Sequence, residues 1–259
     1  MDKYEAFKKD IYKLIGLDLS SYKEKQMKRR ISSLIARNQY KDFDDYFVAI
    51  KKDKVLFEEF INYLTINVSE FFRNPNQWDV MEKVIIPKLK ADNRGKIKIW
   101  SSASSTGEEP YSLAMLMTRF YGLKDIQIDA TDLDLGAIEK AHLGIYSEKS
   151  LKNVPKDLKD KYFEKIGSSY KISDEIKKCV KFKQMNLLKD SYPKGYHLIL
   201  CRNVMIYFTE EAKAEMYHKF NKGLTNDGVF FVGSTEQIIM PERYNFEPIQ
   251  TFFYKKKDK

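Results

Sequence analysis

The segment that decides the fold is KIKIWSSASSTGEEPYS, residues Lys96 to Ser112. Its first part, KIKIWSS (Lys96 to Ser102), is a short β-rich run and predicts a strand. Small residues follow as far as Gly107, and a helix is expected to begin near Pro110. Because small side chains let a ligand approach the backbone closely, this strand, turn and helix are interpreted as part of a ligand site.

Four more β-rich runs follow, most of them separated by helical stretches. They are IQIDATD (Ile126 to Asp132), VKFKQMN (Val180 to Asn186), HLILC (His197 to Cys201) and GVFFVGS (Gly228 to Ser234). Strands that alternate with helices predict a doubly wound, Rossmann-like α/β sheet, with a ligand site at the carboxyl ends of its parallel strands. The tail TFFYKK (Thr251 to Lys256) is expected to add a last strand at the edge. Residues 144–179 read as an inserted subdomain, with a helical piece near Pro155 to Phe163 and a turn at Gly167.

Residues 1–75 predict a small all-helical domain. Apolar residues recur at helical spacing, first at Tyr4, Phe7, Ile11 and Leu14 and then at Met27, Ile31, Leu34 and Ile35. Ser21, followed three residues later by Glu24, matches a capping box at the start of the second helix. A helix from Trp78 to Leu89 is expected to connect the two parts, which gives a linker helix at residues 76–95 and a sheet domain at residues 96–259.

Composition excludes several classes of protein. With 43% hydrophobic and 14% aromatic residues, the 259-residue chain is not globally disordered. No apolar stretch approaches the ~20 residues that span a bilayer, and the start MDKYEAFKKD has no apolar signal core, so a cytoplasmic location is expected. Cys179 and Cys201 form no C-x-x-C pair and are interpreted as buried small residues, so no metal site is expected. The three histidines, His142, His197 and His218, are interpreted as structural.

Positive charge is concentrated near the N-terminus. The chain carries 46 Lys and Arg against 37 Asp and Glu, a net charge of +9. Between Ser20 and Lys41 there are seven basic residues and one acid. This favours an acidic partner, whether nucleic acid, anionic lipid or a carboxylate-rich protein surface, and a merely solvated helix face is the alternative.

The turn after the first strand is not a phosphate-binding loop. It contains neither G-x-G-x-x-G nor GK[ST], and Glu108 and Glu109 sit at the helix start, where they would repel a pyrophosphate. A cationic ligand is therefore favoured. The alternative is that Ser105 with Glu108, or Thr106 with Glu109, is a capping box, although two adjacent acids leave one available.

The second strand ends at Asp132, where open α/β sheets place an acid that holds ribose hydroxyls. N-capping of the next helix is the alternative for Asp132 and the favoured reading for Asp134. Sheet order, small-residue loop and strand-end acid together indicate a nucleoside cofactor that lacks phosphates and carries positive charge. S-adenosylmethionine is such a molecule.

Four blocks of sequence resemble the chemotaxis receptor methyltransferases, the CheR family. They are TINVSEFFR (Thr65 to Arg73), SSASSTGEEPYS (Ser101 to Ser112), ATDLD (Ala130 to Asp134) and CRNVMIYF (Cys201 to Phe208), with VGSTEQ (Val232 to Gln237) where many members have G-H-S-E. The resemblance extends over nearly the whole chain. It implies transfer of a methyl group from S-adenosylmethionine to the γ-carboxylate of glutamates on the cytoplasmic helices of chemoreceptors.

The same resemblance implies the site residues. The implied cofactor contacts are Asn67, Ser69, Arg73, Glu109, Asp132, Asn186, Leu187, Arg202 and Asn203. Tyr207 is expected close to the transferred methyl group, and Arg73 or Tyr207 would orient the incoming carboxylate, as the two catalytic residues. Phe71 and Phe72 are interpreted as packing residues.

The basic stretch gives a candidate docking surface for the receptor, made of Lys25, Lys28, Arg29 and Arg30. In some family members the inserted subdomain docks a peptide from the receptor's C-terminus. Here its turn, Lys165 to Tyr170, is short, so members without that dependence are the closer match. Two rival classes remain, a nucleic-acid methyltransferase and a non-catalytic cofactor-binding scaffold. The chain lacks an Asn-Pro-Pro-Tyr type block or a catalytic Cys beside Pro, which argues against nucleic acid as the substrate.

Overall fold

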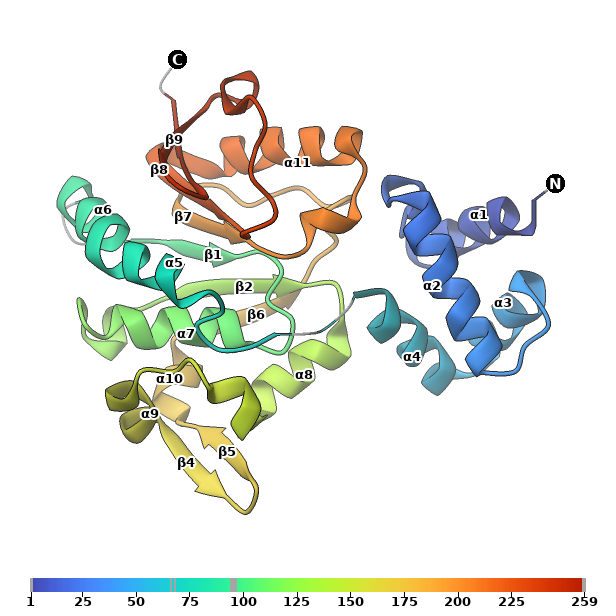
Figure 1. Ribbon diagram of the computed structural model, residues 1–259, viewed down its shortest axis with the longest axis horizontal. Coiled ribbons are helices and arrows are strands. Elements are labelled where there is room, and N and C mark those ends of the chain that lie inside the picture. The colour runs from blue at the N-terminus through green and yellow to red at the C-terminus, as the bar shows by residue number, and fades with distance from the viewer. Residues whose placement is uncertain (1, 66, 68, 94–96, 258–259) are drawn as a thin grey trace.

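The computed structural model describes residues 2–65, 67, 69–93 and 97–257. A helical N-terminal domain lies beside a larger α/β domain, and a small three-stranded sheet projects from the latter (Figure 1). No helix in the described part of the chain is long and apolar enough to cross a membrane.

The N-terminal domain packs four helices around one apolar core. They are α1 (Lys3–Ile15), α2 (Glu24–Arg37), α3 (Phe43–Lys52) and α4 (Lys54–Thr65), with a 3₁₀ turn η1 (Leu19–Ser21) after α1. The side chains of Asp2 and Asp42 cap α1 and α3, and Gly16 ends α1 in the left-handed region at φ 68°. Tyr4, Phe7 and Phe60 are fully buried, as the helical spacing predicted for the first two.

The predicted capping box at Ser21 is wrong. Helix α2 begins at Glu24 with Lys23 as its N-cap, and no side chain caps it. The Ser21 hydroxyl instead donates to Asp18, which caps η1, at 3.1 Å. The backbone N–H of Lys23 donates to the carbonyl oxygen of Tyr207 at 2.9 Å, so the N-cap residue of α2 is hydrogen-bonded to the other domain.

The α/β domain is built on a seven-stranded sheet with the order β6-β2-β1-β7-β8-β10-β9. Its strands are β1 (Ile99–Ser101), β2 (Ile128–Asp132), β6 (Val180–Gln184), β7 (Tyr196–Cys201), β8 (Leu224–Val232), β9 (Phe246–Gln250) and β10 (Phe253–Lys256). The four pairings that join β6, β2, β1, β7 and β8 are all parallel, which confirms the predicted doubly wound sheet.

The prediction that the tail forms the edge strand is wrong. Strand β10 pairs antiparallel with both β8 and β9, so it lies inside the sheet, and β9 is the edge. Pro248 lies in β9, and a residue without an N–H suits an edge strand because one side of such a strand needs no ladder partner.

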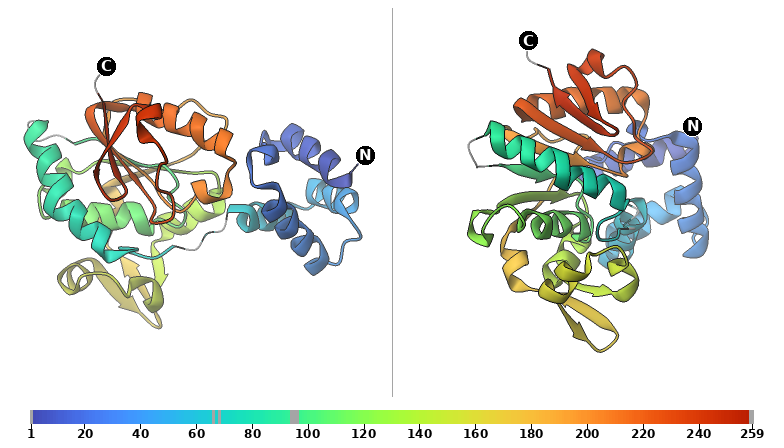
Figure 2. Two further views of the ribbon diagram at one scale, coloured as in Figure 1. Left: turned by 45° about the horizontal axis from the view of Figure 1, so that its top comes forward. Right: turned by 60° about the vertical axis from the view of Figure 1, so that its left-hand side comes forward.

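Alternate residues of the strands divide the interior into two cores. Trp100, Ile199 and Phe230 point to the face covered by α11 (Glu210–Gly223), and their core is continuous with that of the N-terminal domain. Ile99, Leu198 and Phe231 point to the opposite face. That face is covered by α7 (Glu108–Met117) and by the helical run α5 (Pro75–Val80), the π-helical turn η2 (Met81–Ile85) and α6 (Ile86–Asp92). Figure 2 shows helices on both faces and the N-terminal domain next to one end of the sheet.

The helical run Pro75 to Asp92 covers the predicted connecting helix Trp78 to Leu89. Its buried residues Trp78, Met81 and Leu89 share a core with the sheet, so the run packs on the α/β domain. Arg94, Gly95 and Lys96 lie outside the described residues, and the proposed boundaries at 75 and 95 stay a prediction.

The inserted subdomain follows α8 (Leu135–Leu143). It contains β3 (Ile145–Ser147), η4 (Glu148–Leu151), α9 (Lys156–Tyr162), β4 (Phe163–Ile166), β5 (Ser169–Ile172) and α10 (Asp174–Lys178), with strand order β3-β5-β4. Helix α9 lies where the helical piece was predicted, and Gly167 turns at φ 58°. The bounds of the insertion, 144–179, stay a prediction.

Candidate active site

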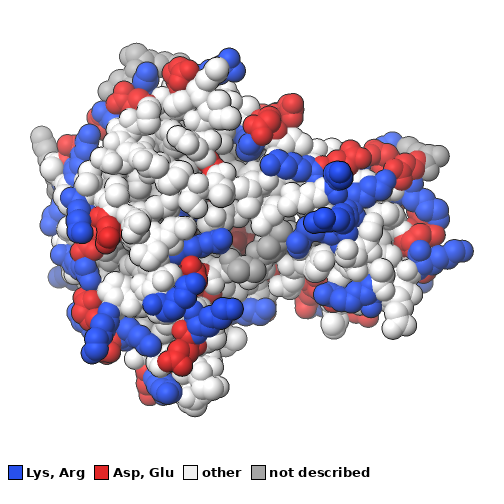
Figure 3. Space-filling model, viewed as in Figure 1, with Lys and Arg blue, Asp and Glu red and all other residues white. Residues whose placement is uncertain are grey.

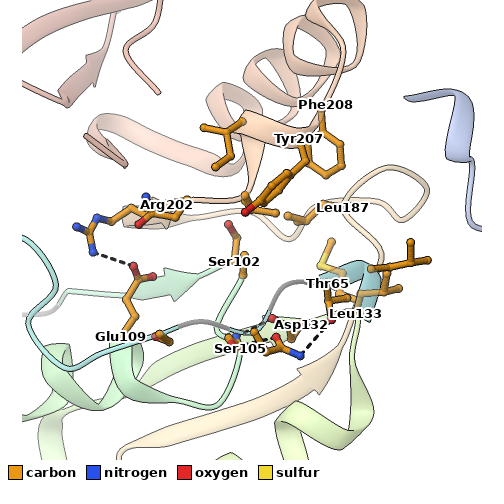
Figure 4. A pocket seen from close by; sticks show the side chains of 18 of the residues that line it. Thr65, Ser102, Ser105, Glu109, Asp132, Leu133, Leu187, Arg202, Tyr207 and Phe208 are labelled. Carbon is orange, nitrogen blue, oxygen red and sulfur yellow. Dashed lines mark hydrogen bonds and ion pairs between the residues drawn. The ribbon is translucent and has the colours of Figure 1, made fainter. Parts of the chain in front are cut away.

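A pocket lies at the carboxyl ends of the parallel strands, where the N-terminal domain meets the sheet. The pocket holds about 1190 Å³ of space that is not filled by protein atoms, and this volume includes the part that is open to solvent. Its lining includes every implied cofactor residue, namely Asn67, Ser69, Arg73, Glu109, Asp132, Asn186, Leu187, Arg202 and Asn203, together with Tyr207. In Figure 4, Tyr207 and Phe208 lie across the pocket from Asp132 and Ser105, and the Glu109–Arg202 pair closes one end.

Asp132 lies at the end of β2 and is buried. Its carboxylate accepts the backbone N–H of Ser105 at 2.6 Å and that of Asp134 at 3.0 Å. Burial raises the pKa of Asp132 to about 6. Asp134, by contrast, caps α8 by accepting the N–H of Ala137, which confirms the predicted cap and separates the roles of the two acids. Because a carboxylate has about four acceptor sites, Asp132 keeps capacity for the hydroxyls of a ribose.

Glu109 and Arg202 form a buried ion pair at 3.2 Å. Glu109 also accepts the Ser101 hydroxyl at 2.8 Å, and Arg202 donates to the Gln77 side chain at 2.8 Å. Burial raises the pKa of Glu109, and the guanidinium of Arg202 opposes this rise. The pair places a carboxylate at one end of the pocket, which suits a cationic ligand.

The capping-box alternative for the two glutamates is wrong. The N-cap of α7 is Gly107, at φ 95°, so Ser105 and Thr106 lie outside the helix. The Thr106 hydroxyl donates to the Glu108 carboxylate at 2.6 Å instead of receiving a helix amide. Both glutamates are buried, and Glu109 is the one that lines the pocket.

The block Thr65 to Arg73 lies between the domains. Ile66 and Val68 lie outside the described residues, so only part of this block can be placed. The Asn67 amide donates to Asp134 at 2.6 Å and accepts the Ser105 hydroxyl at 2.9 Å, which joins the interdomain segment to the pocket loop. Phe71 and Phe72 are 0% and 3% exposed, which confirms their packing role.

Asn186 and Leu187 follow β6. The Asn186 side chain accepts the N–H of Leu188 at 3.0 Å, and the Asn186 backbone N–H donates to Asp190 at 2.8 Å. Leu187 is buried and presents an apolar wall to the pocket. The apolar wall beside a strand-end acid is suited to a base next to a ribose.

Tyr207 ends the 3₁₀ turn η5 (Met205–Tyr207), and a buried carboxylate holds this turn in place. Glu236 accepts the backbone N–H groups of Asn203 at 2.5 Å, Gly233 at 2.9 Å and Ile206 at 3.2 Å. Asn203 adopts the left-handed region at φ 61°. Sequence reasoning noted the VGSTEQ block but assigned no role to Glu236, although this block was the signal that could have found it.

The N-terminal domain completes the pocket with Tyr22, which sequence reasoning also missed. Tyr22 and Phe208 form an antiparallel bridge, with ring centroids 4.9 Å apart. The Thr209 N–H donates to the carbonyl of Ser21 at 2.9 Å, beside the bond from Lys23 to Tyr207. Tyr22 lies close enough to Asp132 for the carboxylate to raise the pKa of the phenol, after burial as the main cause. No local pattern predicts this contact, because it joins residues from two domains.

The predicted docking residues divide into two kinds. Lys28 pairs with Asp2 at 2.7 Å, and Arg30 donates to the carbonyl of Tyr63 and lies over its ring. Lys25 and Arg29 are exposed. In Figure 3, Lys and Arg side chains gather over α2, on the side of the N-terminal domain that faces the α/β domain.

Family models match nearly the whole chain. Residues 67–253 match "CheR methyltransferase, SAM binding domain", and residues 2–65 match "CheR methyltransferase, all-alpha domain". The chain belongs to the CheR methyltransferase family. The family resemblance of the sequence is thus confirmed, and the protein is an S-adenosylmethionine-dependent methyltransferase.

Among CheR relatives, the chain is 45% identical to the chemotaxis protein methyltransferase of Listeria monocytogenes, over 97% of this chain and 96% of the relative. It is 33% identical to the chemotaxis protein methyltransferase of Borreliella burgdorferi, over 98% and 94% of the two chains. Identity to the chemotaxis protein methyltransferase of Escherichia coli is 31%, over 90% and 83%.

The pocket residues fit the CheR cofactor. The fit rests on the chemistry of the groups present, a strand-end carboxylate for ribose hydroxyls, an apolar wall at Leu187 for a base, and acidic Glu109 for a cation. The individual cofactor contacts stay predictions.

Proposed function

We propose that this methyltransferase esterifies the γ-carboxylates of glutamates on the cytoplasmic helices of chemoreceptors. The relatives named above are chemotaxis protein methyltransferases, which supports a role in chemotaxis. The observation that carries the choice of acceptor is the setting of Tyr207. Burial raises the pKa of its phenol, and the positive charges of Arg30 and Arg73 both oppose the rise. A half-buried hydroxyl with two guanidinium groups nearby suits an anionic acceptor.

A glutamate acceptor needs no general base. Its pKa near 4.3 means that the carboxylate is already ionised at pH 7. Bound S-adenosylmethionine supplies an electrophilic methyl group, and the acceptor oxygen gains this methyl without any proton transfer. The protein's task is therefore to bind and align the reactants and to exclude water.

The chain's own residues divide this task. Asp132 accepts hydroxyl hydrogen bonds at one end of the pocket, and the Glu109 carboxylate, paired with Arg202, offers acceptor oxygens for an ammonium group at the other. Tyr207, with Arg73, orients the incoming carboxylate, and these two are the proposed catalytic residues. No thiol or imidazole is needed, and Cys179 and Cys201 are both buried.

The exposed cations Lys25 and Arg29 on α2 are the proposed first contacts with the acidic receptor surface. Because this substrate lies on the cytoplasmic helices of receptors, we propose a cytoplasmic location for the protein. The hairpin turn between β4 and β5 is short, and we propose that recognition does not depend on a receptor C-terminal peptide. Nucleic acid is the rival acceptor that the test below distinguishes.

The test uses the alkali lability of methyl esters. Incubation of the enzyme with methyl-labelled S-adenosylmethionine and receptor-bearing membranes is expected to label protein, and mild alkali is expected to release the label as methanol. Enzyme with Asp132→Ala is the control for label that arises without the pocket. Label that survives alkali, or that appears in RNA, would contradict a carboxylate acceptor.

A further inference from the structure

Several residues of the inserted subdomain contact the pocket wall, and one of them is an inward-pointing tyrosine of β3. In β3, Ile145 and Ser147 are exposed and Tyr146 between them is buried, so the strand alternation sends only this side chain into the α/β domain. The Tyr146 hydroxyl donates to the carbonyl oxygen of Thr106 at 2.8 Å. Thr106 belongs to the loop that follows β1, and Ser105 of the same loop lines the pocket.

The loop is packed closely on this tyrosine. A Cβ atom at Gly107 would lie 3.1 Å from the Tyr146 hydroxyl and 2.9 Å from the side chains of Ala141 and Tyr111. Only glycine at this position lets the chain turn at φ 95° against these groups. In the same loop, the backbone N–H of Ser105 donates a hydrogen bond to Asp132. The position of the loop therefore determines a hydrogen bond of the proposed cofactor site.

Tyr146 also contacts the interdomain segment. Its ring meets the ring of Phe71 edge to face, with centroids 4.7 Å apart, and Phe163 of β4 contacts Phe71 at 5.1 Å. The Phe71 N–H donates to the carbonyl of Ser150 at 3.0 Å. The same segment carries Arg73, two residues further along the chain.

A charged contact adds to this attachment. Glu70 pairs with Lys152 at 2.8 Å and accepts the Asn153 amide at 3.3 Å. Glu70 itself lines the pocket. The subdomain therefore touches two separate parts of the pocket wall, and Tyr146 is the residue that touches both.

We propose that Tyr146 is a positioning residue, through which the inserted subdomain holds the loop Ser102 to Gly107 and the segment Ser69 to Arg73 in their cofactor-binding arrangement. This role is independent of any peptide that the subdomain docks. Coupling between sites is reciprocal, so a cofactor that requires this arrangement also stabilises the subdomain.

The test compares two tyrosines that each lose one hydrogen bond to a backbone carbonyl. Tyr146→Phe removes the bond to Thr106, and Tyr111→Phe removes a 2.9 Å bond to Ala141, which lies in α8. Both variants are expected to lower the unfolding midpoint of the cofactor-free protein to a similar extent. Only Tyr146→Phe is expected to weaken S-adenosylmethionine binding in calorimetry, by about threefold to tenfold. Wild-type affinity in Tyr146→Phe, or equal weakening in both variants, would overturn the proposal.

A second measurement needs no variant. Hydrogen exchange of the wild-type protein is followed with and without S-adenosylmethionine, at the amides that pair β3 with β5. The proposal expects slower exchange there when the cofactor is bound, while the amides that pair β9 with β10 change less. If the amides of the β3–β5 ladder exchange at the same rate with and without the cofactor, the coupling is refuted, whatever the variants show.

Discussion

The guanidinium of Arg202 and the carboxylate of Glu109 lie 3.2 Å apart, with 2% and 11% of their side chains exposed. Arg202 extends this contact to the carbonyl of Arg73 at 2.9 Å and to the side chain of Gln77. One buried cation thus connects the end of β7, the start of α7 and the interdomain segment. The pair fixes the end of the pocket that is suited to a positive charge.

Removal of one member of this pair is expected to be costly. Arg202→Ala leaves the Glu109 charge buried without its partner, and a loss of about 3–5 kcal/mol in the free energy of unfolding is expected. Urea denaturation measures it. The control is Lys156→Ala, which breaks the exposed pair with Asp160 and is expected to have little effect on stability, because both side chains are solvated. Equal losses in the free energy of unfolding would show that the buried pair contributes no more to stability than the exposed pair does.

Cofactor affinity is expected to fall as the pH drops below about 6, because the pKa of Asp132 is raised to about 6 by burial. A protonated carboxyl accepts ribose hydroxyls less well, so the dissociation constant rises by at most about tenfold per pH unit in this range. Calorimetry between pH 5 and 8 tests this, and Asp132→Asn is expected to bind weakly and without this pH dependence. A wild-type affinity that stays flat across this range would contradict the assignment.

Protonation of Asp132 has the opposite effect on the stability of the cofactor-free protein, which it increases. In the folded state the pKa of Asp132 is about 6, above the usual 3.8. The folded protein therefore binds the proton at a higher pH than the unfolded chain does. The stabilisation from the protonated carboxyl is therefore complete below pH 3.8 and is lost as the pH rises through about 6. Asp132→Asn is expected to remove this part of the pH dependence of unfolding.

Charge reversal at the two exposed docking residues is expected to impair receptor methylation selectively. Lys25→Glu with Arg29→Glu should lower kcat/KM on receptor membranes and reduce its salt dependence, while cofactor affinity stays unchanged. Lys52→Glu on α3 is the matched control, since it changes an exposed charge on another helix. An unchanged kcat/KM in the double variant would reduce this surface to a solvated helix face. Lys28 is left out because it pairs with Asp2, so its replacement would also break an ion pair within the helical domain.

Glu236→Gln is expected to lower kcat by about tenfold, because the amide cannot accept from Asn203, Gly233 and Ile206 together as the carboxylate does. If the effect acts through the turn that carries Tyr207, the same substitution costs less in a Tyr207→Phe background. Glu211→Gln, an exposed position on α11, is the control. Equal losses in both backgrounds would exclude an action through Tyr207.

The sequence predicted those parts of the site that depend on local order. Asp132 was found because it ends a buried strand, and Arg202, which the family resemblance implied, directly follows another. Parallel strands bring their carboxyl ends together. Tyr22 and Glu236 were missed because their roles depend on contacts with Phe208 and Asn203, which are distant in the chain. No periodicity records such contacts.

The errors in the fold have a similar origin. A capping box at Ser21 was locally sound, but the helix begins at Glu24, and the backbone of its N-cap residue Lys23 is hydrogen-bonded to the other domain. The edge strand was misplaced because the short segment Phe246–Gln250 was not recognised as a strand, and it pairs outside Phe253–Lys256. Local propensity is overruled where a partner from elsewhere in the chain completes the hydrogen bonding.

The pairing of Ser21 to Lys23 with Tyr207 to Thr209 limits how this architecture can diversify. The backbone of the helical domain is hydrogen-bonded to the turn that carries Tyr207. Replacement of this domain alone by that of a relative is therefore expected to break these interdomain hydrogen bonds. A chimaera in which residues 1–65 come from one homologue would have to carry a compatible turn at residues 203–209 as well. Changes in receptor specificity are therefore more accessible through the exposed residues of α2 than through replacement of the whole domain, since Lys25 and Arg29 can vary without breaking these interdomain hydrogen bonds.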